Sequence, residues 1–230
     1  MLDQQTGHAR RPSRHLPPIG LTVAVVLYAI AMAYLESAVV VYLRAAIGVP
    51  TGRIFPIDLS PTAMPFGWIE VGREGATLVM IGAVGWLAGR SPLERLAWAA
   101  VVFGIWDIGY YAWLWVFSGW PPGLGTWDLL FLLPAPWAGP VWAPIAVSAA
   151  LIVFGLACAG RLRTGLPVRF DRRHLAGLLL GGAVVIVSFL TNAGLVLSGG
   201  MPTAFAWPIF AAGMGIGMGA AWLALRPASG

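Results

Sequence analysis

Residues 19–47 read IGLTVAVVLYAIAMAYLESAVVVYLRAAI, an apolar run with only two charged side chains, Glu36 and Arg44. A helix needs about 20 apolar residues to cross the hydrocarbon core of a bilayer, so this run predicts a membrane-spanning helix. Barrel strands are shorter and alternate in polarity, which this run does not. The stretch also imitates a signal peptide with a cleavage site at residues 31–33, but its apolar character continues to Leu43, so we favour an uncleaved span.

The composition extends this interpretation to the whole chain. Hydrophobic residues make up 59% and charged residues 10% of the 230 residues, and the mean hydropathy is +0.81. Soluble domains carry about 25% charged residues, so most of this surface must face a lipid bilayer. Further apolar runs lie near residues 68–88, 97–117, 141–159, 175–197 and 204–225. We therefore predict an all-α bundle of six transmembrane helices, with one transmembrane domain over residues 19–226 after a basic tail at residues 1–18.

The positive charges predict the orientation. The net charge is +5, every basic residue other than His is an Arg, and Arg gathers in the tail and in the segments 90–95 and 161–173. Short cytoplasmic segments of membrane proteins are enriched in Lys and Arg, so both termini are predicted to be cytoplasmic. Topology explains the positive charge without any nucleic-acid partner.

The segments 48–67 and 118–140 are then the outer loops, and both are rich in proline. Within the second loop, residues 127–133 form an apolar stretch that starts at Trp127 and Asp128 but is too short to cross a bilayer. We expect it to lie at the membrane interface or to enter as a re-entrant segment.

Ionisable and polar residues inside the apolar runs indicate a site. Such side chains are costly at membrane depth and usually face the bundle interior or a cavity. They recur at helical spacing, so each helix presents one polar face. With one acid from the second outer loop, the predicted site residues are Glu36, Arg44, Glu70, Arg73, Glu74, Asp107, Tyr110, Tyr111, Asp128 and Asn192. We expect these faces to converge on one pocket that opens to the outer side.

The acids of this pocket outnumber its arginines, so a positive counter-charge is expected. Protons, a divalent cation or an organic ammonium group could supply it. A metal would be held by oxygen atoms of Glu36, Glu70, Glu74 and Asp107, which favours Mg, Ca or Mn. No haem or zinc is expected, because the His residues and Cys158 lie at the predicted inner side. The alternative is a purely structural role, in which these side chains join helices to one another.

Four motifs carry a resemblance. They are YLR at residues 42–44, EVGREGAT at 70–77, WDIGYY at 106–111 and WDLLFLLPAPWAGP at 127–140. Together they resemble an uncharacterised group of bacterial polytopic membrane proteins, over about residues 42–144. The resemblance implies a bacterial cytoplasmic membrane and no particular reaction.

Three functions remain open. The first is a transporter whose pocket binds a cation, a proton or a small polar substrate. The second is a membrane enzyme acting on a lipid or small molecule at the outer leaflet. The third is a non-catalytic subunit or assembly factor. Gly213 and Gly217, four residues apart, predict close helix packing within the chain, or else a face for a second copy or a membrane partner.

Overall fold

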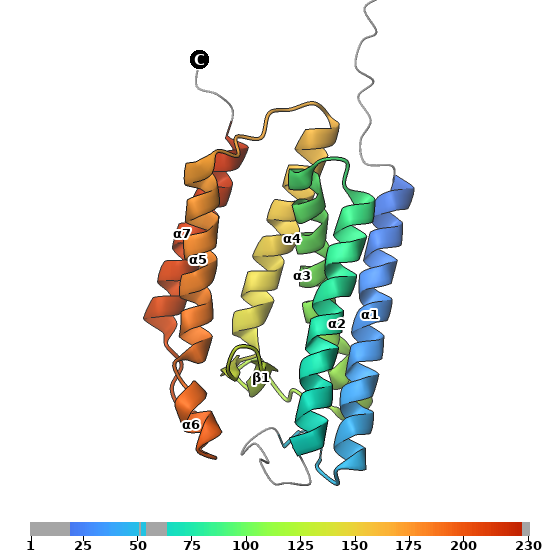
Figure 1. Ribbon diagram of the computed structural model, residues 1–230, viewed down its shortest axis with the longest axis vertical. Helices are drawn as coiled ribbons and strands as arrows, with labels where there is room; N and C mark the ends of the chain where they lie inside the picture. The colour runs from blue at the N-terminus through green and yellow to red at the C-terminus, as the bar shows by residue number, and fades with distance from the viewer. Residues whose placement is uncertain (1–18, 51, 54–63, 227–230) are drawn as a thin grey trace, which may run out of the picture.

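The computed structural model describes residues 19–50, 52–53 and 64–226. The predicted tail at residues 1–18 lies outside these ranges, as does part of the first outer loop. The elements are α1 (Ile19–Ala46), α2 (Met64–Ala88), α3 (Pro92–Ser118), β1 (Trp127–Phe131), β2 (Trp137–Pro140), α4 (Trp142–Arg163), α5 (Arg172–Leu190), α6 (Ala193–Leu197) and α7 (Trp207–Leu225). The long helices run alongside one another, and both ends of the described chain lie at the same end of the bundle (Figure 1).

Within the described ranges, five stretches are long and apolar enough to cross a membrane: α1, α3, α4, the stretch Arg172–Leu197 and α7. They are compatible with a polytopic membrane protein. Helix α2 is of similar length, packs against α3 and carries Glu70, Arg73 and Glu74 in its first half, and it is not among these five. Its crossing, the sixth of the predicted set, stays a prediction, as does the side on which the termini lie.

Helix α3 is the centre of the larger group of helices and packs against α1, α2 and α4. The close approach of α3 to α4 depends on two glycines. A Cβ atom on Gly104 would lie 2.5 Å from the carbonyl oxygen of Ser148, and one on Gly155 would lie 2.5 Å from that of Ala97. Small residues bring helix backbones together in this way in membranes.

Helices α5 and α7 form a second group and pack mainly against each other (Figure 1). A Cβ atom on Gly181 of α5 would lie 2.5 Å from the backbone nitrogen of Gly217, and one on Gly213 would lie 2.7 Å from that of Val185. The Gly213 and Gly217 face of α7 therefore packs within the chain. Association with a partner or a second copy stays a prediction.

The predicted run at residues 175–197 is not one uninterrupted helix. Helix α5 ends at Leu190 and the short α6 begins at Ala193. In the last turn of α5 the hydroxyl of Ser188 donates to the carbonyl of Val185 over 2.6 Å, and at the break the hydroxyl of Thr191 donates to the carbonyl of Ser188 over 2.8 Å. Such bonds from side chain to backbone compete with the helix and bend it.

The second outer loop contains a β-hairpin that an all-α fold does not include. Strand β1 pairs with β2 in antiparallel register, with Asp128 opposite Gly139 and Leu129 opposite Ala138. The hairpin lies at the end of the bundle opposite the described termini (Figure 1). The N–H and C=O groups of a non-helical backbone at membrane depth must be hydrogen-bonded or covered by protein. We expected residues 127–133 at the interface or in a re-entrant segment, and the hydrogen bonds between β1 and β2 meet this need there.

Candidate functional site

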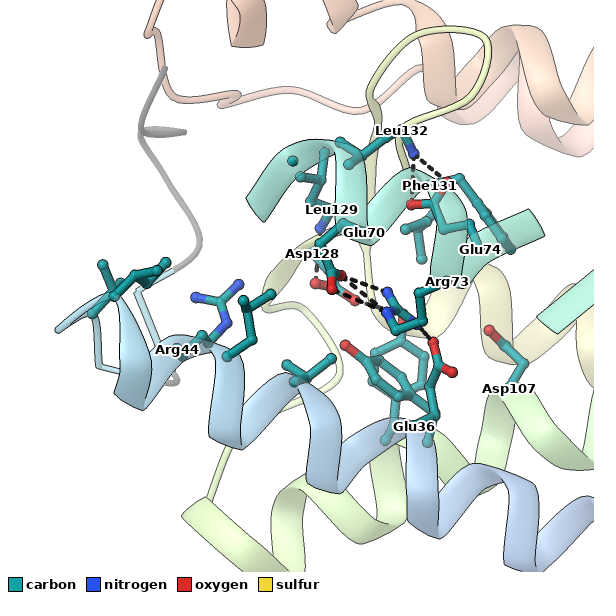
Figure 2. A pocket seen from close by; sticks show the side chains of 18 of the residues that line it. Glu36, Arg44, Glu70, Arg73, Glu74, Asp107, Asp128, Leu129, Phe131 and Leu132 are labelled. Atoms are coloured by element: carbon teal, nitrogen blue, oxygen red, sulfur yellow. Dashed lines mark hydrogen bonds and ion pairs between the residues drawn. The ribbon is translucent and has the colours of Figure 1, made fainter. Parts of the chain in front are cut away.

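A cavity of about 220 Å³ lies among α1, α2, α3 and the hairpin. We call it the polar chamber. Nine of the predicted site residues line it: Glu36, Arg44, Glu70, Arg73, Glu74, Asp107, Tyr110, Tyr111 and Asp128. Figure 2 shows that the labelled charged side chains come from α1, α2, α3 and β1 and lie around one space. The chamber is at the end of the bundle that holds the hairpin.

Arg73 connects two helices across the chamber. Its Nε and Nη2 atoms donate to the Glu70 carboxylate on the same helix, at 3.1 and 2.7 Å. Its Nη1 atom contacts the Glu36 carboxylate of α1 (Figure 2). Glu36 also accepts a hydrogen bond from Thr77 over 3.2 Å. One guanidinium thus serves two carboxylates, and the group keeps a formal charge of minus one.

Glu74 does not pair with Arg73, although the two are adjacent in sequence. Its carboxylate accepts the backbone N–H of Leu132, at 2.9 and 3.1 Å from the two oxygens (Figure 2). The side chain is buried, with 5% of its surface exposed. Glu74 therefore attaches the hairpin loop to α2.

Asp107 lies near the middle of α3, and its partner comes from α4. The hydroxyl of Ser148 donates to Oδ2 of Asp107 over 2.8 Å, and both residues are buried. No arginine lies within ion-pair distance of Asp107 among the described residues. This carboxylate is thus held by a neutral donor only.

Asp128 of β1 is held by α3. The hydroxyl of Tyr111 donates to its Oδ2 atom over 2.9 Å, and the backbone N–H of Leu129 donates to Oδ1 over 2.8 Å. Burial raises the pKa of the Asp128 carboxyl above its usual value, and the hydrogen bond from Tyr111 acts in the opposite direction.

Tyr110 and Arg44 add an aromatic and a basic side chain to the lining of the chamber. The Tyr110 ring meets the Tyr111 ring edge-on, with centroids 5.2 Å apart. Nη1 of Arg44 donates to the backbone carbonyl of Arg53 over 2.7 Å, which ties α1 to the following loop. Arg53 also lines the chamber.

Asn192 lies outside the chamber. It precedes α6, and its amide donates to the carbonyl of Ala204 over 3.1 Å. Asn192 follows the end of α5 and contacts the segment that leads into α7, and it does not line the chamber. Its predicted place among the binding residues is therefore not supported by its position.

The divalent-metal prediction gains no support from the geometry. Within the described ranges, no three His, Cys, Asp or Glu side chains gather closely enough to hold an ion. Glu36 and Glu70 contact Arg73, Glu74 accepts a backbone N–H, and Asp107 accepts a hydroxyl. An oxygen-ligated metal stays a prediction.

Sequence reasoning missed Ser148 and Trp106. Ser148 is a lone hydroxyl within an apolar run, and nothing in its neighbourhood in the sequence pairs it with Asp107. Trp106 lines the chamber with 5% of its surface exposed, and its indole N–H has no acceptor among the described residues. Its position next to Asp107 in the sequence was the available signal.

The chamber therefore carries five carboxylates and three guanidinium groups among its lining residues, a formal charge of minus two if all ionise. Aromatic rings lie beside this charge.

No family model, curated protein or solved structure matches the chain. The chamber itself therefore carries the functional interpretation.

Proposed function

We propose that the chain is a membrane transporter whose polar chamber binds a small organic ammonium ion. The observation that carries this proposal is the Asp107 carboxylate, which is buried in the chamber wall and whose only hydrogen-bond partner within the described part of the chain is the Ser148 hydroxyl. An ionised acid at membrane depth is costly unless a positive charge offsets it. A bound cation supplies that charge.

Two further features support an ammonium ion over a bare metal ion. Tyr110, Tyr111 and Trp106 line the same cavity, and aromatic faces attract ammonium groups. The carboxylates are also dispersed over four elements, and each is engaged by a donor within the chain, with Glu36 and Glu70 sharing Arg73, so they do not form a compact set of metal ligands.

Equilibrium dialysis tests binding. The purified chain in lipid nanodiscs is dialysed against radiolabelled tetramethylammonium, with empty nanodiscs as the blank. Asp107→Asn keeps the shape and the contact with Ser148 but removes the charge, so affinity should fall about tenfold or more. Asp171→Asn, at the start of α5 and outside the chamber, is the matched control and should bind normally. A folded wild-type protein that binds no tetramethylammonium would contradict the proposal.

Proteoliposomes test transport separately from binding. Uptake of the same ion should require the wild-type chain and should decrease in the Asp107→Asn variant. Binding without any uptake would retain the site but reject the transport part of the proposal.

One observation favours a second candidate, a non-catalytic subunit or assembly factor. Each carboxylate of the chamber accepts a hydrogen bond or forms an ion pair within the chain; these carboxylates belong to Glu36, Glu70, Glu74, Asp107 and Asp128. In that case the cluster would only join helices. Asp107→Asn would then alter thermal stability while tetramethylammonium would have no effect on either protein.

The cellular location belongs to the same proposal. Arg90 lies between α2 and α3, Arg95 lies in the first turn of α3, and Arg161 and Arg163 lie in the last turn of α4. These helix ends lie at the end of the bundle where the described chain begins and ends (Figure 1). This arrangement supports a bacterial cytoplasmic membrane with that end on the cytoplasmic side, and with the chamber on the outer side.

A further inference from the structure

A second cavity lies beside the polar chamber and differs from it in chemistry. It has a volume of about 510 Å³ and lies between α3 and α4 on one side and α5 and α7 on the other. Its walls are side chains such as Phe103, Leu151 and Phe154 from the first group and Leu178, Ile186 and Met214 from the second. We call it the apolar groove.

Among the described residues, Asp107 is the only charged residue that lines the groove. Asp107, Leu130 and Phe131 are shared, because they line both the groove and the polar chamber. A carboxylate thus lies where an apolar space meets a polar and aromatic one. Ser148, which donates to Asp107, lines the groove as well.

This juxtaposition selects one kind of occupant. A neutral hydrocarbon chain would suit the groove walls but would leave the acid without a counter-charge. A small hydrophilic cation would suit the acid but would leave the groove empty. A molecule with an ammonium head and a hydrocarbon tail satisfies both, because its charge lies beside Asp107 while its tail contacts apolar side chains.

We propose that the apolar groove and the polar chamber together bind an amphipathic ammonium compound, with the head at Asp107 and the hydrocarbon tail between α4 and the α5–α7 pair. This inference rests on the proposed function and narrows its substrate class. It adds the requirement that the groove must be open for the ligand to bind tightly.

A single substitution can block the groove without disturbing the helix packing. A Cβ atom on Gly182 of α5 meets nothing within 4 Å, and Gly182 lines the groove. Gly182→Leu should therefore occupy the groove without displacing backbone. Gly215 of α7 also has open space around its Cβ position and does not line the groove, so Gly215→Leu is the matched control.

Two probes with the same head separate the two cavities. Tetramethylammonium has the head alone, and dodecyltrimethylammonium adds the tail. Each is dialysed against wild-type and variant proteins in nanodiscs, with empty nanodiscs to subtract partitioning. Folding of each variant is checked by gel filtration and thermal unfolding.

Gly182→Leu should weaken binding of dodecyltrimethylammonium about tenfold, the effect of displacing two methylene groups from their contacts. It should leave tetramethylammonium binding unchanged, and Gly215→Leu should change neither. Asp107→Asn should weaken both probes.

Three results would overturn the inference. If Gly182→Leu binds both probes like the wild type, the tail does not occupy the groove, while the proposed function stands. If uncharged dodecanol binds as tightly as the ammonium compound and is insensitive to Asp107→Asn, the groove holds neutral lipid. If neither probe binds the folded wild type, the proposed function fails together with this inference.

Discussion

Glu74 of α2 accepts the backbone N–H of Leu132 with both carboxylate oxygens, at 2.9 and 3.1 Å. The two residues are 58 positions apart, and their contact attaches the hairpin loop to the helix that carries Glu70 and Arg73. Glu74→Ala should remove a charged acceptor and destabilise the protein by about 1.5–3 kcal/mol. Hydrogen exchange of the Leu132 amide should accelerate, as measured by mass spectrometry. Glu74→Gln, which keeps an acceptor oxygen, should show a smaller effect, and equal exchange in all three proteins would contradict this role.

Arg73 should be the most sensitive side chain of the chamber to substitution. Arg73→Gln leaves the carboxylates of Glu36 and Glu70 near each other without their cation. Because Arg73 and Glu70 are 20% and 18% exposed, the cost should lie below the about 3–5 kcal/mol of a fully buried ion pair. Adding Glu36→Gln should restore part of the loss. A double-mutant cycle in thermal unfolding measures the coupling. Additive effects would show that the contact between Arg73 and Glu36 contributes no coupling energy.

The Asp128 carboxyl should titrate above the usual range of an aspartic acid, because burial raises its pKa. When the pKa of a group is higher in the folded protein than in the unfolded chain, protonation of that group stabilises the fold. This contribution is complete at pH values below the unfolded-state pKa, and it is lost as the pH rises through the folded-state pKa. Tyr111→Phe removes the donor to Asp128 and should raise its pKa further. Infrared titration of the protonated carboxyl band, assigned with Asp128→Asn, measures this shift. Tyr110→Phe is the matched control, and an equal shift in both variants would reject a specific Tyr111 contribution.

Two adjacent glycines of α5 should respond oppositely to the same substitution. A Cβ atom on Gly181 would clash with the Gly217 backbone at 2.5 Å, whereas one on Gly182 meets open space. Gly181→Ala should destabilise the pair of α5 and α7 by about 1–3 kcal/mol. Gly182→Ala should be neutral or stabilising by up to about 1 kcal/mol, because Ala favours a helix. Thermal unfolding in detergent compares them, and equal melting temperatures would contradict the close packing.

The orientation can be tested by labelling single cysteines in intact cells. Cys158 is buried and is first replaced in a Cys158→Ser background. A membrane-impermeant maleimide should label Gly123→Cys, in the exposed loop before the hairpin. It should label Leu166→Cys, exposed between α4 and α5, only after the cells are opened. The reverse pattern would invert the topology and place the chamber on the cytoplasmic side.

Local spacing predicted part of the chamber. The interval of three residues between Glu70 and Arg73 indicates one helical face, and the structure has an ion pair there. The same logic places Glu74 on that face, yet its partner is a backbone N–H of the hairpin. Spacing along one helix shows which side chains share a direction, but it does not show which element lies opposite them.

Neither the hairpin nor the apolar groove was predicted from the sequence. Residues 127–133 lack a regular alternation of polar and apolar side chains, so the ladder between β1 and β2 had no clear signal. The groove lies between two helix groups that come from distant parts of the chain, and Ser148 reaches Asp107 from another helix.

The sequence by itself determined that this chain forms apolar helices suited to a bilayer, because hydrophobicity over about 20 residues is a local property. It also identified most of the charged residues that line the chamber, because a buried charge is conspicuous in an apolar run. Only the tertiary structure decided that Arg73 contacts Glu36, that Asn192 lies elsewhere, and that Asp107 borders both cavities. These relationships depend on how the helices pack, which is set by contacts such as those of Gly104 and Gly181 between residues far apart in the sequence.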